Sequence, residues 1–200
     1  MIPSNPVTHN FGNSLLVEFN WGEFDLHKAD IIEYCLNLEK PNTVESNIAV
    51  SAKHNLWESK FNFLESNSPG VIALKLWLVQ ECEKYVSTIN NKNYKFVITE
   101  SWAHVTREGG YHLPHYHSGS TWSGIFYIGC DGTTGKNCWQ VPYNLERKPG
   151  LDFINDRFSF IPTLGKLIMF PSMITHYAES YFGKSPRIVV AFNAVCIQHG

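Results

Sequence analysis

The spacing of apolar side chains changes character near the middle of the chain. Within residues 27–40 the apolar positions recur at the interval of a helix, and Pro41 ends the run. Residues 69–90 carry a broader apolar face, with Pro69 suited to the first turn of a helix and a cluster of asparagines after the last apolar position. These patterns predict two helices in the first half of the chain.

From residue 94 onward apolar and polar side chains alternate, and β-branched and aromatic residues are frequent. The predicted strands are residues 94–105, 123–130, 157–161, 166–170 and 187–197. Helices followed by antiparallel-type strands are typical of an α+β fold in which the helices pack on a β-sandwich or barrel. We expect one domain over residues 1–200, with a mostly helical support region at 1–93 and a β core at 94–197.

Composition narrows the functional classes. A chain of 200 residues, 44% of them hydrophobic, can bury one sizeable core. A net charge of −2 and the lack of any Lys/Arg block argue against nucleic acid as a partner, and the apolar runs are too short to span a membrane. The chain has no dinucleotide-binding glycine motif and no G-x-S-x-G nucleophile motif. Five scattered cysteines and an N-terminus unlike a signal peptide predict a cytoplasmic protein.

Three of the nine histidines lie within six positions, in the run His-Leu-Pro-His-Tyr-His at residues 112–117. In an extended segment His115 and His117 point to the same face, where their imidazoles can converge on one metal ion. Iron, zinc, copper and nickel all accept imidazole. His176 is the candidate third ligand, because it follows a predicted strand and a Pro-Ser break. His112 could be a ligand or a structural residue, and His104 is expected to be an ordinary surface or core residue.

Three classes of metal protein fit this pattern. A cupin would match His115-x-His117, but Thr121 and Trp122 stand where its acidic ligand is expected. A zinc hydrolase needs a carboxylate as general base, and Glu108 is the nearby candidate. A non-haem Fe(II) oxygenase needs three ligands on one side of the ion, open positions for oxygen and cosubstrate, and a cation for the cosubstrate's far carboxylate. The histidines alone leave all three classes open.

Arg187 is the candidate for that cation. It begins an otherwise apolar predicted strand, and an arginine on the inner face of such a strand is costly unless it pairs with an anion. The guanidinium group suits a carboxylate, which it binds through two parallel hydrogen bonds. The alternative is that Arg187 points outward at the strand end into water.

Three blocks together resemble a known family. They are His115-x-His117 followed by Ser123-Gly-Ile-Phe-Tyr-Ile, then Pro162-x-x-Gly-x-Leu-x-x-Phe-Pro-Ser-x-x-x-His176, then Arg187-Ile-Val-Val-Ala-Phe-Asn. Over roughly residues 50–195 the chain is similar to the 2-oxoglutarate/Fe(II) oxygenases known from phage and bacterial genomes, distant relatives of the prolyl hydroxylases.

The resemblance implies a double-stranded β-helix, the jelly-roll and cupin-like core, supported by the N-terminal helices. It implies Fe(II), 2-oxoglutarate and O₂ as cofactor and cosubstrates. The implied reaction is hydroxylation of an unactivated C–H bond in a small-molecule or peptidyl substrate, with release of succinate and CO₂. His115 and His176 correspond to iron ligands, and Arg187 corresponds to the anchor of the 2-oxoglutarate C5 carboxylate.

The chain departs from the family pattern at two places. His117 stands where the wider superfamily has Asp or Glu, so it is either a third imidazole ligand or not a ligand. Val189 stands where many relatives have a serine hydroxyl beside the arginine, and Tyr127 or Tyr111 could supply that hydroxyl instead. Asn193 shares the strand face of Arg187 by parity and could either reach the site or merely satisfy backbone groups at the strand end.

Two other readings of the site stay open at this point. One is a degenerate barrel that has lost its iron site and serves as a binding module or virion component, although the presence of His115, His176 and Arg187 argues against it. The other is a cupin-like protein with three histidines, including a dioxygenase that needs no cosubstrate, which would bind metal without using Arg187. The polar segment 129–149 is predicted to be a lid over the site. Edge strands of such barrels often pair, which allows a homodimer.

Overall fold

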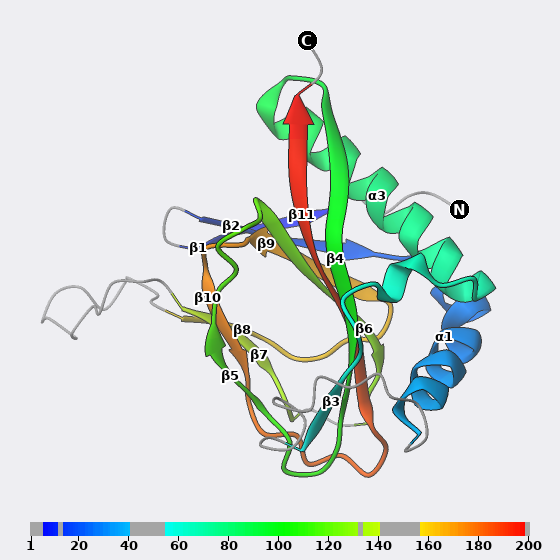
Figure 1. Ribbon diagram of the computed structural model, residues 1–200. Coiled ribbons are helices and arrows are strands. Elements are labelled where there is room, and N and C mark those ends of the chain that lie inside the picture. The colour runs from blue at the N-terminus through cyan, green and yellow to red at the C-terminus, as the bar shows by residue number, and fades with distance from the viewer. Residues whose placement is uncertain (1–5, 12–13, 41–54, 132–133, 141–156, 199–200) are drawn as a thin grey trace, which may run out of the picture.

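The computed structural model describes residues 6–11, 14–40, 55–131, 134–140 and 157–198. Two β-sheets face each other, and two helices cover the outer face of the larger sheet (Figure 1). The predicted α+β class and the double-stranded β-helix core are confirmed by this arrangement. Within these ranges no helix is long and apolar enough to cross a membrane.

The two helices are α1 (Phe24–Glu39) and α3 (Pro69–Asn90), with a 3-10 turn, η1 (Phe63–Glu65), before the second. The strands are β1 (Val7–Phe11), β2 (Ser14–Asn20), β3 (Leu56–Glu58), β4 (Tyr94–Thr106), β5 (His112–His115), β6 (Trp122–Gly129), β7 (Asn137–Gln140), β8 (Arg157–Phe160), β9 (Lys166–Pro171), β10 (Thr175–Ala178) and β11 (Arg187–Gln198).

The large sheet has the strand order β1-β2-β9-β6-β11-β4-β3, and the small sheet has the order β5-β10-β7-β8. Every neighbouring pair in both sheets is antiparallel. Because the two sheets face each other, the short strands β5 and β10 lie opposite the long central strands of the large sheet (Figure 1).

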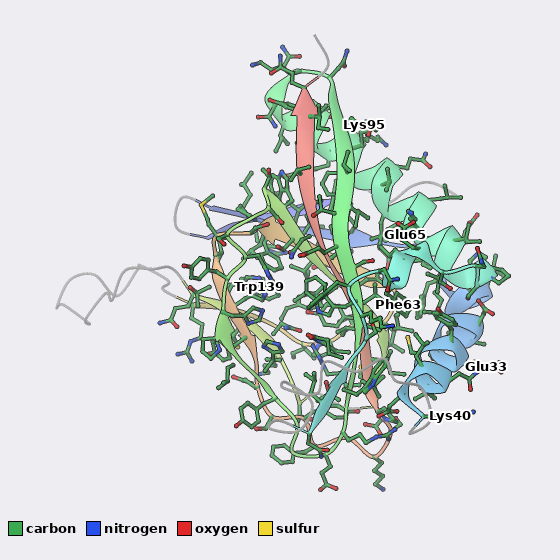
Figure 2. All side chains as sticks on the ribbon, viewed as in Figure 1. Glu33, Lys40, Phe63, Glu65, Lys95 and Trp139 are labelled. Atoms are coloured by element: carbon green, nitrogen blue, oxygen red, sulfur yellow. The ribbon has the colours of Figure 1, made fainter. Side chains whose placement is uncertain are left out.

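Two apolar clusters hold the layers together. The helix-side cluster joins α1 and α3 to the outer face of the large sheet, and the inner cluster fills the space between the two sheets. Figure 2 labels Phe63, a member of the first cluster, beside the helices and Trp139, a member of the second, on the side of the small sheet. Alternation along β11 serves both clusters, because Ile188 and Val190 face the helices while Val189 faces the small sheet.

Both predicted helices are confirmed. Helix α1 begins three residues earlier than predicted, at Phe24, whose side chain is buried. Helix α3 has Pro69 in its first turn and ends at Asn90, and the next residue, Asn91, caps it in the left-handed conformation with φ of 50°.

The prediction of a mostly helical region at 1–93 was incomplete, because β1, β2 and β3 join the large sheet. Strand β2 is buried on both faces: Leu16 belongs to the inner cluster and Val17 to the helix-side cluster. A strand buried on both faces loses the apolar–polar alternation, which explains why its sequence was not recognised as a strand.

The small sheet was also predicted incompletely. All four of its strands are only four residues long, and β5, β7 and β10, which carry no clear alternation, were not predicted. Part of the predicted lid at 129–149 is instead strand β7, where Asn137, Cys138 and Trp139 are buried, so the lid prediction is wrong there. Residues 132–133 and 141–149 of that segment lie outside the described residues.

Gly124 in β6 is a point where the two central strands pack too closely for a side chain. A Cβ atom there would lie 2.4 Å from ring atoms of Phe192, which is fully buried. We expect Gly124→Ala to lower the free energy of unfolding by about 1–3 kcal/mol, because the ring has no room to move. Urea denaturation measures the change. Gly119→Ala is the matched control, since nothing lies within 4 Å of its Cβ position, and an equal loss in both variants would contradict the packing explanation.

Candidate metal centre

The small sheet brings two of the predicted histidine ligands together. His115, the last residue of β5, is the cross-strand partner of His176 in β10. Their ring centroids lie 4.2 Å apart, and His176 is buried. Directly paired residues of an antiparallel sheet carry side chains on the same face, so register alone explains this contact across sixty-one positions of sequence.

His117 reaches the same place from a loop. Strand β5 ends at His115, so the expectation of two histidines on one continuous strand was wrong in detail. The backbone N–H of His117 donates to the carbonyl of Ser172 at 2.9 Å, and Ser172 is completely buried. The Pro-Ser break after β9 thus holds the His117 loop in place. The His117 ring centroid lies 5.1 Å from that of His115 and 5.3 Å from that of His176.

The orientation of two of these imidazoles is fixed by backbone carbonyls. Nδ1 of His115 lies 2.8 Å from the carbonyl oxygen of Leu113, and Nδ1 of His176 lies 3.1 Å from that of Ile174. A carbonyl oxygen can only accept, so Nδ1 carries the proton in both rings and Nε2 keeps its lone pair. This is the tautomer that binds a metal through Nε2.

The environment also keeps the three imidazoles neutral. Burial lowers the pKa of His176 well below its ordinary value, and the neighbouring His115 lowers it further. Burial and the same neighbour lower the pKa of His117 to about 4. The pKa of His115 is lowered as well, mainly by burial. All three side chains are therefore in the neutral, metal-binding form at neutral pH.

The donor set fits one divalent transition-metal ion. Candidate ligand nitrogens of the three histidines all lie within 4.8 Å of one another. Ligand atoms at about 2.1 Å from a tetrahedral ion are roughly 3.4 Å apart, so only small side-chain shifts are needed. Three neutral imidazoles suit iron, zinc, copper or nickel, and they would occupy one side of the ion.

Arg187 points inward, so the outward, solvated alternative is wrong. It is 2% exposed, and its guanidinium lies over the ring of Tyr127, 5.7 Å from the ring centroid. Nη2 donates to Oδ1 of Asn137, whereas the buried Nε has no hydrogen-bond partner among the described residues. Burial lowers the pKa of Arg187, yet a guanidinium keeps its charge in proteins. A buried cation with an unsatisfied N–H donor fits the carboxylate of a ligand.

Tyr127 and Asn137 form the support of this cation. The Tyr127 hydroxyl donates to Oδ1 of Asn137 at 2.9 Å, so one amide oxygen accepts from both Tyr127 and Arg187. Burial raises the pKa of Tyr127, which keeps the phenol neutral. Asn137 was not predicted as a site residue. Its position in a four-residue strand carries no sequence signal for this role.

One pocket connects the histidines to Arg187. His115, His117, His176 and Arg187 line it, and apolar side chains of β6 and β11 form its wall: Ile125, Val189 and Ala191. Val189 confirms that β11 offers no hydroxyl beside Arg187.

Two predicted cosubstrate contacts lie elsewhere. Tyr111 is half-buried just before β5 and is not among the residues that line the pocket. Asn193 shares the strand face of Arg187 but lies six residues away, about 20 Å along the strand. Its side chain bonds Ser123 at 2.8 Å and Glu100 at 3.0 Å. The structure therefore does not bring Asn193 to the guanidinium.

The sequence reasoning missed a second polar group at this pocket. His104 and His112 line it, and Glu58 contacts His104. The contact between Glu58 and His104 arises from the pairing of β3 with β4. Strand β3 is only three residues long, which is too short to be recognised from the sequence.

The comparisons with known proteins agree with this geometry. Residues 100–193 match the family model described as "Putative 2OG-Fe(II) oxygenase", and this stretch contains all three histidines and Arg187. The family uses Fe(II), 2-oxoglutarate and O₂. No curated protein matches the chain.

Solved structures share the fold over most of the chain. A prolyl-4-hydroxylase from Pseudomonas putida has a TM-score of 0.61 at 10% identity, covering 89% of this chain and 91% of that one. A collagen prolyl hydroxylase from Paramecium Bursaria Chlorella virus-1, solved as a 2OG complex, has a TM-score of 0.57 at 12% identity, covering 90% and 94%. HygX from Streptomyces hygroscopicus, solved with nickel and 2-oxoglutarate, has a TM-score of 0.56 at 11% identity, covering 90% and 82%.

At these identities the structural likeness concerns the fold, whereas the family match concerns the sequence of the core that carries the site. Over residues 100–193, just under half of its length, the chain is therefore similar in sequence to the 2OG-Fe(II) oxygenases.

Proposed function

We propose that this protein is a 2-oxoglutarate/Fe(II) oxygenase that hydroxylates an unactivated C–H bond of its substrate, with His115, His117 and His176 as the iron ligands and Arg187 as the anchor of 2-oxoglutarate. The main support is that one pocket holds three converging imidazoles and a buried arginine whose Nε–H has no hydrogen-bond partner among the described residues. A metal protein that needs no cosubstrate has no use for such a cation, which counts against the three-histidine alternative.

Each residue has a defined task in this proposal. Arg187 binds the C5 carboxylate of 2-oxoglutarate, with its free Nε–H and the remaining guanidinium N–H groups as donors. Asn137 and Tyr127 orient the guanidinium. The apolar wall of β6 and β11 excludes water between the two ends of the cosubstrate. Iron, when bound, supplies the activation of O₂ that the protein side chains cannot.

The substrate is proposed to approach past His117. A shallow depression adjoins this residue on the outside of the pocket, lined by Thr99, Glu100, Tyr116 and the loop from Ser118 to Ser120. Tyr116 is 60% exposed there, so its ring is available for contact. The polar lining suits a polar small molecule or a peptide segment. The free thiols of all five cysteines favour a reducing compartment such as the cytoplasm.

Isotope labelling tests the reaction. With Fe(II), 2-oxoglutarate and ¹⁸O₂, we expect succinate that carries one ¹⁸O atom, because one oxygen atom enters succinate and the other enters the hydroxylated product. Mass spectrometry of succinate, with and without a small-molecule extract as a source of substrate, measures the yield. His176→Ala is the control for free iron in solution. Labelled succinate no more abundant than in that variant would contradict the proposal.

A further inference from the structure

A second group of potential metal ligands lies beside the three histidines. Its members are Glu58 in β3, His104 in β4 and His112 at the start of β5, and their candidate ligand atoms all lie within 4.8 Å of one another. The proposed oxygenase mechanism uses none of the three. We refer to these residues as the second triad.

Strand register builds the second triad. Glu58 is the direct cross-strand partner of His104, and Oε2 of Glu58 lies 2.7 Å from Nε2 of His104. The two side chains are only 6% and 11% exposed. The His104 ring stacks on that of His112 at a centroid separation of 5.3 Å and an interplanar angle of 26°. Buried groups held in this way have a defined geometry before any ion arrives.

The imidazole of His112 is oriented by a backbone carbonyl, as those of His115 and His176 are. Its Nδ1 lies 3.1 Å from the carbonyl oxygen of Leu113, so Nδ1 carries the proton and Nε2 keeps its lone pair. His115 uses the same carbonyl through its own Nδ1 at 2.8 Å. One backbone carbonyl thus fixes two imidazoles, one in each group of ligands.

We propose that Glu58, His104 and His112 bind a second divalent transition-metal ion. Two imidazoles and one carboxylate form the donor set that non-haem Fe(II) sites use, and zinc accepts the same ligands. Ligand atoms of a tetrahedral ion are roughly 3.4 Å apart. That separation falls between the 2.7 Å that joins Glu58 and His104 and the 4.8 Å within which all candidate ligand atoms of the second triad lie.

The two ions would be neighbours. The rings of His112 and His115 lie 4.2 Å apart, and both triads contribute to one pocket, which gives the second ion a route of entry. Two adjacent dications repel each other, and the Glu58 carboxylate offsets this because it adds a negative charge that the three-histidine site lacks. The ordinary alternative is that Glu58 and His104 form only a buried hydrogen bond.

Cobalt binding distinguishes these alternatives without any activity assay. Metal-free protein is loaded with Co(II) alone, unbound ions are removed, and the metal content and visible absorption are measured. We expect two ions per wild-type chain and one in Glu58→Gln, since an amide is a poor ligand but has the shape of the carboxylate. The second-triad affinity should fall at least about 100-fold. His112→Ala, at a half-buried position, should give the same result.

Glu18→Gln is the matched control. Glu18 also faces a histidine, His9, at 3.7 Å, but the described part of the chain groups no further candidate ligand with this pair, so the variant should keep two ions. One ion in wild type, or an unchanged content in both Glu58→Gln and His112→Ala, overturns the proposal. Glu58→Gln leaves His115, His117, His176 and Arg187 in place. Its binding of 2-oxoglutarate therefore reports separately on the oxygenase function.

Discussion

Replacing His176 with alanine should abolish formation of the Fe(II)–2-oxoglutarate complex. His176 is buried, its Nδ1 is fixed by Ile174, and its Nε2 is one of three proposed ligands. Loss of one of three ligands should weaken iron binding at this site by more than the 10- to 100-fold that loss of a residue supporting a ligand costs. The measurement is anaerobic titration of the Fe(II)-loaded protein with 2-oxoglutarate, followed through the weak visible metal-to-ligand charge-transfer band.

The charge-transfer band is the appropriate readout because it requires iron and 2-oxoglutarate at one site, so an ion bound by the second triad does not produce it. His27→Ala is the matched control, since His27 stacks on Trp21 and neither residue lines the pocket. Wild type and His27→Ala should give the band and His176→Ala should not. A band of normal intensity in His176→Ala would exclude this residue as a ligand.

Arg187→Ala should keep the iron but lose most of the affinity for 2-oxoglutarate. Truncation of one partner of a buried, hydrogen-bonded charge pair costs about 2–5 kcal/mol. That range corresponds to roughly 30- to 4,000-fold weaker binding, at tenfold for each 1.4 kcal/mol. The same titration measures it, as a shift of the half-saturating concentration. The affinity of Arg187→Lys for 2-oxoglutarate should lie between those of wild type and Arg187→Ala, since lysine keeps the charge but lacks the planar donor pair.

Thermal denaturation without cosubstrate shows whether Arg187→Ala is folded. The buried guanidinium is held only by Asn137 and the Tyr127 ring among the contacts described for it, so its removal should not lower the melting temperature much. Unchanged 2-oxoglutarate affinity in a folded Arg187→Ala would place the carboxylate elsewhere and return the three-histidine, cosubstrate-free protein to consideration.

The sequence was most informative where one element carries its own signal. Helix α3 and the long strands β4 and β11 have regular patterns, and all three were predicted within one or two residues. The direction of Arg187 was left open by the sequence, because an inward arginine in an apolar strand is costly unless it pairs with an anion, and the structure shows that the side chain is buried.

What depends on pairing between distant strands could not be predicted. The contact of His115 with His176 and that of Glu58 with His104 both arise from cross-strand register, between segments forty-six to sixty-one positions apart. The first was proposed because of its residue types, and the second was missed because Glu58 stands in a three-residue strand that was not predicted. Asn193 was placed on the correct strand face but at the wrong end of the strand, since parity says nothing of distance.

The carbonyl groups of Leu113 and Ile174 have a consequence for how fast the centre can assemble. A free imidazole exchanges between two tautomers and rotates about its bonds, and only part of that ensemble can coordinate through Nε2. In His115 and His176 the hydrogen bond from Nδ1 already fixes the tautomer and the ring orientation. An ion therefore binds to two preorganised imidazoles, neither of which must first reorient. The rate of metal uptake should therefore be governed by entry into the pocket and by shedding of water from the ion.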